Sequence, residues 1–398
     1  MTGRFWAVTA AGLVAGVAFG WSPPAGATTP ALPLPSGVST PSQSSVSLPM
    51  GHLGDPDNTF WELFIRPSGG TSWTLRTPVG VADNGGLVVA NPVNGPVTVG
   101  FLPSQLLRFS PLAETSDGGK AWSPGDLSAA LVAAPDALAG GSSDPTTALV
   151  TGSGQTVLSS QNLFRWHKLA TTWSLAKTVK GCGVQRITAL VSDGSYPALG
   201  VQCSRAGRIG VLFPKAATTA PSTGTGTGTA WTNGGPLLTN AASGVATVLR
   251  LEATGSNSSG AAEGLNGLVA VKLGRSSSLV AFWSVGTESN WTQSKRLTLP
   301  KGWTVSATAT GGGNTGRGIS VLLDSGVHRR IVSLTGPGAP WVTLVPPADT
   351  EATVTIGSET DAFVVAKSHL TIWASAPGMT GWSRVQSTTV PVPYGSSG

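Results

Sequence analysis

Few residues of this chain carry side chains suited to covalent or acid–base chemistry. Its 398 residues include two cysteines, two tyrosines, four histidines and 18 acids. The histidines lie at least 41 residues apart, with no His-x-His or His-x-x-x-His pair, whereas zinc ligands are usually closely spaced. The glycine-rich segments 223–228 and 311–316 lack the lysine and the following helix of a phosphate-binding loop. The sequence therefore predicts no metal site and no cofactor.

Carboxylate pairs for hydrolysis are also scarce. Glycoside hydrolysis needs two carboxylates roughly 5 to 9.5 Å apart. The densest acidic cluster, Asp55-Pro56-Asp57-Asn58, is interpreted as a turn with capping side chains. Glu351, Glu359 and Asp361 bracket two strand ends and are expected to face solvent. A Ser-His-Asp triad stays open, since serine and aspartate are plentiful and nothing marks one.

The two cysteines, Cys182 and Cys203, are expected to form a structural disulfide. An even cysteine count in an exported chain favours a bridge, and the Cys-x-x-Cys spacing of a redox pair is absent. Residues 185–191 and 198–202 read as strands joined by a turn at Asp193-Gly194, so the hairpin brings both cysteines together. Such a bridge contributes roughly 3 kcal/mol by loop entropy.

The first 27 residues have the three parts of a secretory signal peptide. Arg4 is followed by an apolar run over 5–19 and by Ala25-Gly26-Ala27, a small-x-small cleavage pattern. An apolar run of about fifteen residues is shorter than the roughly twenty that span a bilayer. We therefore expect cleavage after Ala27, a Pro/Ser/Thr-rich tether over 28–50, and no membrane span after cleavage. The folded domain is expected at 51–398.

Composition excludes two broad classes. The net charge of +6 is dilute, and only 11% of residues are charged, which leaves no basic stripe for nucleic acid. The 54 glycines and 29 prolines, together with few charged residues, disfavour a helical bundle, which needs strong helix formers on its polar faces.

Tryptophans mark a repeat. Seven of the 14 share one context, in which an apolar strand and a Gly/Ser/Thr/Pro turn precede the ring and a short strand follows it. Their spacings are 49, 51, 58, 60, 50 and 41 residues. A unit of about fifty residues is typical of a propeller or a solenoid. The seven landmarks are Trp73, Trp122, Trp173, Trp231, Trp291, Trp341 and Trp382.

Between landmarks the sequence reads as further short strands, for example 304–309, 318–323 and 329–334. Four antiparallel strands per unit of this length make a propeller blade. The expected fold is thus an all-β, seven-bladed propeller of four-stranded blades. A six-bladed ring with a stray hairpin is the alternative, because little sequence precedes the first hairpin at 61–77. Seven blades require that the tether folds into that first blade.

One turn carries a sharper motif. Thr115-Ser116-Asp117-Gly118-Gly119-Lys120-Ala121-Trp122 matches Ser/Thr-x-Asp-x-Gly-x-Thr-Trp except at Ala121. Asp117 is suited to accept backbone hydrogen bonds within its own turn, and Gly119 tolerates positive φ. The segment resembles the Asp-box, or bacterial neuraminidase repeat, of sialidase-like propellers. In that family the motif supports the fold and lies away from the active site, so Thr115, Asp117, Gly119 and Trp122 are structural candidates.

The resemblance also implies what an enzyme would need: three arginines on the substrate carboxylate, a tyrosine nucleophile with a glutamate, and an aspartic acid/base. Phe64-Ile65-Arg66-Pro67 has the residues of the family's Phe/Tyr-Arg-Ile-Pro motif with arginine and isoleucine exchanged. A shift of one position in a strand turns a side chain to the other face. If the chain were a hydrolase, Arg66 and Tyr196 would be its candidate residues.

The scarcity of acids, tyrosine and histidine favours a different function. We expect an exported, non-catalytic propeller, secreted or held in the cell envelope, that acts as a monomeric binding or scaffold module. Its expected partners are extracellular glycans or envelope proteins. The alternative is a diverged sialidase-like glycoside hydrolase, an exo-glycosidase.

Overall fold

The computed structural model describes residues 33–391 apart from 54–57, 80–84, 94, 103–107, 141–144, 153, 193–196, 216–229, 239–243, 255–263, 286–289, 312–316 and 377–380. The predicted signal peptide, Tyr196 and the Asp55–Asp57 cluster lie outside the described residues. The boundaries of the signal peptide therefore stay predictions. Apart from one short helix, the regular elements of the described part are β-strands.

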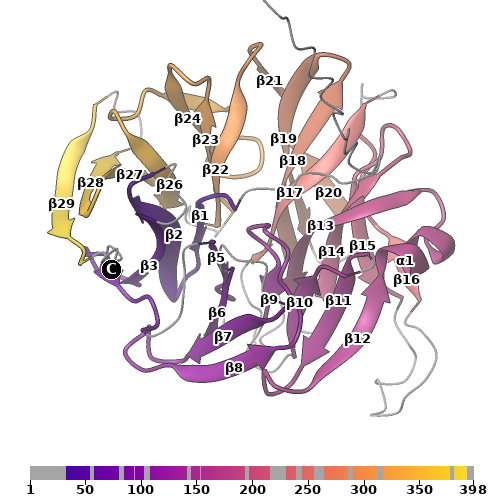
Figure 1. The fold of residues 1–398 in the computed structure, drawn as a ribbon. Coiled ribbons are helices and arrows are strands. Elements are labelled where there is room, and N and C mark those ends of the chain that lie inside the picture. The colour runs from indigo at the N-terminus through magenta and orange to yellow at the C-terminus, as the bar shows by residue number, and fades with distance from the viewer. Residues whose placement is uncertain are drawn as a thin grey trace, which may run out of the picture. The chain divides into compact units, whose positions relative to one another are not determined.

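Five sheets follow a four-stranded antiparallel path, each built from consecutive strands (Figure 1). Short apolar segments separated by Gly-rich turns produce this pattern, because hairpins join neighbouring antiparallel strands most directly. The first sheet comprises β5 (Leu87–Ala90), β6 (Val97–Phe101), β7 (Ser110–Thr115) and β8 (Ser123–Leu127). The second comprises β9 (Leu138–Ala139), β10 (Thr146–Val150), β11 (Thr156–Ser160) and β12 (Trp166–Thr171). The third comprises β13 (Val184–Ser192), β14 (Pro197–Cys203), β15 (Gly210–Pro214) and β16 (Trp231–Asn233).

The fourth sheet has an extra strand that pairs with its third member. It comprises β17 (Val245–Thr254), β18 (Gly264–Leu273), β19 (Ser276–Val285) and β20 (Asn290–Gln293), with β21 (Leu297–Leu299) on β19. The fifth comprises β26 (Thr350–Ile356), β27 (Glu359–Ala366), β28 (His369–Ser375) and β29 (Ser383–Thr389).

The remaining eight strands form one continuous sheet in the order β25-β24-β23-β22-β1-β2-β3-β4. Its first half contains β22 (Thr304–Gly311), β23 (Ile319–Asp324), β24 (Arg329–Leu334) and β25 (Val342–Leu344). Its second half contains β1 (Ser36–Ser39), β2 (Gln43–Gly51), β3 (Thr59–Pro67) and β4 (Thr74–Leu75).

The predicted number of blades is wrong. The structure has five four-stranded blades in a propeller ring together with the eight-stranded sheet, and neither seven nor six separate four-stranded blades. The physical reason is β1, which pairs antiparallel with β2 and parallel with β22, so that main-chain hydrogen bonds run through without a sheet boundary. The tryptophan spacing counts turns and carries no information about this parallel pairing.

The inner strands of successive sheets contact one another around the ring. β2 contacts β5, β5 contacts β9, β9 contacts β13, β13 contacts β17, and β17 contacts β22. β26 contacts β22, β1 and β2, which completes the circuit. The hydrophobic clusters lie between these sheets; one, for example, joins β2, β26 and β28 through Val46, Val354 and Ile372.

β1 lies inside the ring because its residues, Ser-Gly-Val-Ser, have small side chains. A Cβ at Gly37 would lie 3.1 Å from Cβ of Ala309 and 3.3 Å from Cβ of Val354. Glycine therefore lets β1 approach β22 and β26 at a distance that a larger residue would prevent. β1 and most of β2 fall within 28–50, so the part of that range from Ser36 onward belongs to the sheet rather than to a tether.

One landmark tryptophan is not in a strand. Trp173 lies in helix α1 (Thr172–Thr178), and 68% of its surface is exposed. A capping box starts this helix, because the Thr171 hydroxyl accepts from the Ser174 amide while the Thr171 amide donates to the Ser174 hydroxyl. Trp166, at the start of β12, takes the place in this blade that the sequence assigned to Trp173.

Tryptophans at the outer strands link neighbouring sheets. In four of them the indole N–H donates to a main-chain carbonyl of the preceding sheet or of the loop that follows it, at 2.7–2.9 Å. These half-buried indoles find an acceptor in the neighbouring sheet or loop, so four junctions each gain one polar link of this kind. The pairs are Trp166 to Asp126, Trp291 to Gly234, Trp341 to Lys295, and Trp382 to Val345.

Among the described residues, no helix is long and apolar enough to cross a membrane.

Candidate functional site

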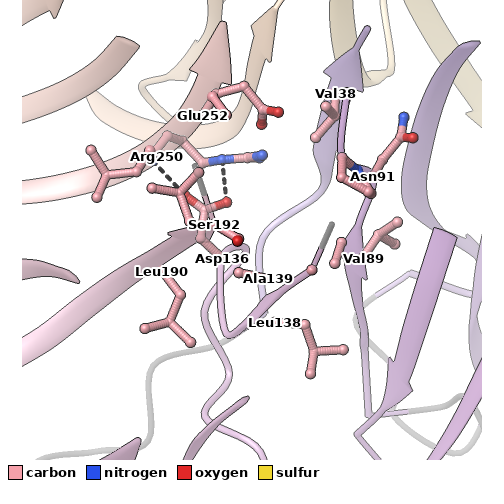
Figure 2. Close-up of a pocket in the computed structure, with 16 residues that line it drawn as sticks. Val38, Val89, Asn91, Asp136, Leu138, Ala139, Leu190, Ser192, Arg250 and Glu252 are labelled. Atoms are coloured by element: carbon pink, nitrogen blue, oxygen red, sulfur yellow. Dashed lines mark hydrogen bonds and ion pairs between the residues drawn. The ribbon is translucent and has the colours of Figure 1, made fainter. Parts of the chain in front are cut away.

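The carboxyl ends of four inner strands meet β1 around a small cavity, which we call the channel cavity (Figure 2). Because the inner strands β5, β9, β13 and β17 occupy the same position in their sheets, their last residues gather at one end of the ring. Polar and charged side chains collect there among apolar ones. The lining includes Val38, Val89, Asn91, Asp136, Leu138, Leu190, Ser192, Arg250 and Glu252.

Asp136 connects three sheets. Asp136 lies just before β9. Its backbone oxygen accepts from the Leu190 amide of β13 at 2.8 Å, and its Oδ2 accepts from the Leu251 amide of β17 at 2.7 Å. Only 4% of the residue is exposed. Burial raises the pKa of Asp136 to about 6, although the charge of Arg250 and the hydrogen bond from Leu251 act to lower it.

Arg250 is a fully buried cation. Its Nε lies 2.6 Å from Oδ1 of Asp136, and its other nitrogens lie 3.4 Å from the Thr308 carbonyl and the Thr310 hydroxyl of β22. A buried guanidinium needs a partner charge and several acceptors. Arg250 therefore joins β22 to the residue that precedes β9.

Glu252 lies two residues after Arg250 and shares its face of β17. Figure 2 shows both side chains projecting from one side of the cavity toward Val38 and Asn91. The Thr310 hydroxyl donates to Oε2 of Glu252 at 3.4 Å. Burial raises the pKa of Glu252 to about 8; Arg250 lowers it and the neighbouring Asp136 raises it.

Reasoning from the sequence missed this cluster. Two charged residues alternate within an otherwise apolar strand, Val-Leu-Arg-Leu-Glu-Ala over 248–253. An alternation of that kind places both charges on one face, which in an inner strand is a signal of a buried polar cluster. Asp136 gives no comparable signal, because its partner is 114 residues away in the sequence.

The channel cavity is too small for an organic ligand. It leaves about 30 Å³, which is room for a water molecule or two. Asp136 is paired with Arg250 and Glu252 accepts from the Thr310 hydroxyl, so the arrangement holds sheets together.

A second hollow lies at the blade rim and leaves about 280 Å³. We call it the rim hollow. Its walls come from the β1–β2 turn, the end of β3 with the turn that follows, and the last residue of β26. The lining consists of Thr40, Gln43, Ser44, Arg66, Pro67, Ser68, Gly69, Gly70, Thr71 and Ile356.

The two sites are neighbours at the same end of the inner strands. The Gln43 amide of the rim hollow donates to Oδ1 of Asn91, which lines the channel cavity, at 3.2 Å. Asn91 in turn donates to the Ser45 hydroxyl at 3.1 Å.

Arg66 is part of the rim hollow and lies apart from the channel cavity. Its Nη1 is 3.2 Å from Oδ2 of Asp361 and 3.8 Å from Glu359, and its Nε donates to the Gly70 carbonyl at 2.7 Å. The Trp73 indole donates to the same Asp361 oxygen at 3.0 Å. These contacts join the sheet of β3 to β27.

The expectation that Asp361 faces solvent is wrong. Its side chain is fully buried, and burial raises its pKa to about 7; Trp73 and Arg66 lower the value and Glu359 raises it. Glu359 and Asp361 lie two residues apart on the same face of β27. Asp361 is buried against Trp73, whereas Glu359 is the first residue of the strand and its side chain stays 41% exposed. Glu351 is also paired, at 2.8 Å from Arg329.

The turn of the sharp motif is closed by its own side chains. Oδ1 of Asp117 accepts from the amides of Lys120 and Ala121 at 2.9 and 3.0 Å, and from the Thr115 hydroxyl at 2.8 Å. These donors lower the pKa of Asp117. Gly118 and Gly119 have φ of 73° and 83°, the region that favours glycine.

A second turn uses the same chemistry with asparagine. Oδ1 of Asn162 accepts from the amides of Phe164 and Arg165 at 3.1 and 2.9 Å, and Trp166 follows. The sequence search missed it because asparagine replaces aspartate and one residue fewer precedes the tryptophan.

The predicted disulfide between Cys182 and Cys203 is present, with the two Cα atoms 4.8 Å apart. It joins Cys182, two residues before β13, to the last residue of β14, as the hairpin argument predicts. Within the described ranges, no group of three or more His, Cys, Asp or Glu side chains is arranged to hold a metal ion.

Comparisons with known proteins support the fold. No protein-family model and no curated protein sequence matches the chain. A GH74 xyloglucanase from Xanthomonas campestris is similar in structure with 12% identity and a TM-score of 0.53, over 87% of this chain and 52% of the enzyme. This chain thus spans about half the length of that enzyme.

Two further structures resemble the chain. A putative 6-phosphogluconolactonase from Bacteroides fragilis has 11% identity and a TM-score of 0.51, over 89% of this chain and 97% of the other. A fucose-specific lectin from Aleuria aurantia has 13% identity and a TM-score of 0.41, over 91% and 96%. At these identities the similarity to the xyloglucanase and the putative lactonase concerns the fold alone, and together with the ring of sheets it shows that the chain is a β-propeller. The sialidase-like family is not confirmed.

Proposed function

We propose that this chain is an exported, non-catalytic β-propeller that binds an extracellular glycan or an envelope protein through its loops and blade rims. Rim and loop surfaces are where propellers place variable recognition residues, because the sheets beneath them are rigid. Export is supported by the N-terminal sequence and by the disulfide, which persists in oxidising compartments.

The observation that carries the proposal is the contrast between the two cavities. In the channel cavity Asp136, Arg250 and Glu252 are more than nine-tenths buried and leave about 30 Å³. The rim hollow leaves about 280 Å³, close to the lower end of ligand pockets, which begin at roughly 300 Å³. Of these two cavities, the rim hollow is the one with space for a ligand.

The same contrast argues against the hydrolase alternative. A hydrolase needs two carboxylates that reach substrate, whereas Asp136 is bound to Arg250 and a main-chain amide inside the ring. The charge of Arg66 is paired with Asp361, so this residue offers no uncompensated cation to a substrate carboxylate.

The experiment is a glycan array probed with the full chain, secreted from an export-competent host, alongside a panel of fluorogenic glycosides that includes sialosides. We expect retention on a subset of glycans and no turnover. Turnover of any glycoside above a heat-inactivated control would contradict the non-catalytic role. If no glycan binds, binding of an envelope protein is the remaining possibility. It is then tested by co-purification from the source envelope, with the Thr71→Trp variant as comparison.

A further inference from the structure

The rim hollow has walls that are fixed before any ligand arrives. In the β1–β2 turn, the Thr40 amide and hydroxyl both donate to the Gln43 carbonyl at 2.9 Å. The facing turn is tied to it, since the Ser68 amide donates to the Ser42 carbonyl at 2.9 Å. Preformed walls reduce the entropy lost on binding.

Arg66 brings a hydrogen-bond donor to the hollow. Its Nε and Nη1 are held by Gly70 and Asp361, which fixes the plane of the guanidinium. Within the described part of the chain, no acceptor is paired with its Nη2. The side chain is 18% exposed, so this nitrogen is the part of a fixed fork left to donate to a ligand.

Two hydroxyls on the same turn add polar groups. Ser68 and Thr71 are exposed and line the hollow, and among the described residues their side chains make no hydrogen bond. Ile356 contributes a half-buried apolar wall from β26. Donors and hydroxyls on one side with an aliphatic surface on the other suit a sugar ring, which has both hydroxyl and C–H faces.

The charge around Arg66 decides the class of sugar. Asp361 lies 3.2 Å and Glu359 3.8 Å from Nη1, so two acids face one guanidinium. Their presence leaves no excess positive charge for a carboxylate or a sulfate. A neutral ligand avoids repulsion by Glu359 and still uses the free N–H groups.

The size decides the extent of the ligand. About 280 Å³ accommodates one ring with its hydroxyls and not a long oligosaccharide, given that drug-sized ligands occupy roughly 300 to 1,000 Å³.

We propose that the rim hollow is a subsite for a single neutral hexose residue, held by hydrogen bonds from Arg66 Nη2 and the hydroxyls of Ser68 and Thr71. This inference rests on the binding function proposed above and names its site and ligand class. It differs from a sialic-acid site, which would need an anion-binding arginine cluster.

The test compares two tryptophan substitutions on neighbouring exposed residues. Thr71→Trp places a bulky ring in the hollow, and Ser72→Trp places the same ring on an exposed residue that does not line it. Binding is measured by saturation-transfer NMR with the methyl glycosides of glucose, galactose and mannose, and with methyl glucuronide as the anionic counterpart. Unchanged thermal unfolding shows that both variants are folded.

We expect at least one neutral glycoside to bind the wild-type protein more tightly than methyl glucuronide does. Thr71→Trp should weaken that binding at least tenfold, Ser72→Trp less than twofold, and Arg66→Lys by severalfold with folding retained. Three results would overturn the proposed subsite: both tryptophan substitutions weaken glycoside binding equally, neither weakens it, or methyl glucuronide binds more tightly than the neutral glycosides. Binding on the glycan array would still support the proposed function in these cases. Absence of binding to every glycan on the array overturns the glycan function and the subsite together.

Discussion

Nε of Arg250 lies 2.6 Å from Oδ1 of Asp136, although two complete sheets, β9 to β12 and β13 to β16, separate the two residues along the chain. The ion pair is buried, and Asp136 also accepts from Leu251 and, through its backbone oxygen, from Leu190. The end of the ring is thus held by one side-chain pair that contacts several inner strands at once.

Removing one member of this pair should be strongly destabilising. Asp136→Ala leaves the Arg250 guanidinium buried without its counter-charge, and breaking such a pair costs about 3 to 5 kcal/mol. The double variant Asp136→Leu/Arg250→Met replaces both charges by apolar groups and should recover most of the loss. Urea unfolding followed by tryptophan fluorescence measures both. Additive losses in the double variant would show that the two residues act independently.

Stability should fall as pH rises from about 5 to above 8. Glu252 keeps its proton up to about pH 8 in the folded protein, whereas the unfolded chain loses it near 4.5. Between these values the folded state binds more protons, so a higher pH favours unfolding. Asp136 and Asp361, raised to about 6 and 7, act in the same direction over lower pH ranges. The melting temperature should drop by several degrees between pH 5 and 8.5.

Glu252→Gln is the control for that pH dependence. The amide resembles the protonated carboxyl and does not ionise, so the decrease between pH 7 and 8.5 should be much smaller in this variant. An identical decrease in the variant and the wild-type protein would show that Glu252 does not titrate in this range.

Gly37→Val should destabilise the propeller. The added atoms would meet Ala309 and Val354 at 3.1–3.3 Å or less, and overpacking a buried site typically costs about 1 to 3 kcal/mol. Gly154→Ala is the matched control, because a Cβ there meets nothing within 4 Å. Chemical unfolding of the two variants should differ by at least 1 kcal/mol; equal stabilities would show that β1 is not tightly packed in the ring.

Loss of the Cys182–Cys203 disulfide should lower stability without changing the fold. The bridge closes a segment with a sequence separation of 21, and such bridges typically contribute about 2 to 4 kcal/mol. The double serine variant should unfold at lower denaturant concentration and no longer respond to dithiothreitol, while the wild-type protein does respond. An unchanged midpoint in the serine variant would contradict a stabilising role.

The sequence predicted what local patterns determine. Strand alternation and Gly-rich turns located most strands, the Asp193-Gly194 hairpin argument paired Cys182 with Cys203, and the residues of the Thr115–Trp122 motif closed their turn as expected. Helix α1 was not predicted, because its seven residues lie in an otherwise β-rich stretch and the capping box at Thr171 is the feature that starts the helix.

The rest depends on contacts between distant segments. The parallel pairing of β1 with β22 joins residues about 270 positions apart and leaves no mark in the local sequence. The same holds for Arg66 with Asp361, and for Asp136 with Arg250. Which charged residues are buried follows from ring closure, so the channel cavity and the rim hollow became visible only in the structure.

The proposal of a non-catalytic propeller that binds sugars at its rim is tested most directly by whether a bound glycan is recovered intact. The secreted protein is incubated with a neutral glycan selected on the array, and the glycan is recovered and analysed by chromatography and mass spectrometry, with Thr71→Trp in parallel. We predict saturable binding that the substitution weakens at least tenfold, and recovery of the glycan intact. A shortened glycan, or binding that Thr71→Trp leaves unchanged, would contradict a non-catalytic propeller that binds sugars at its rim.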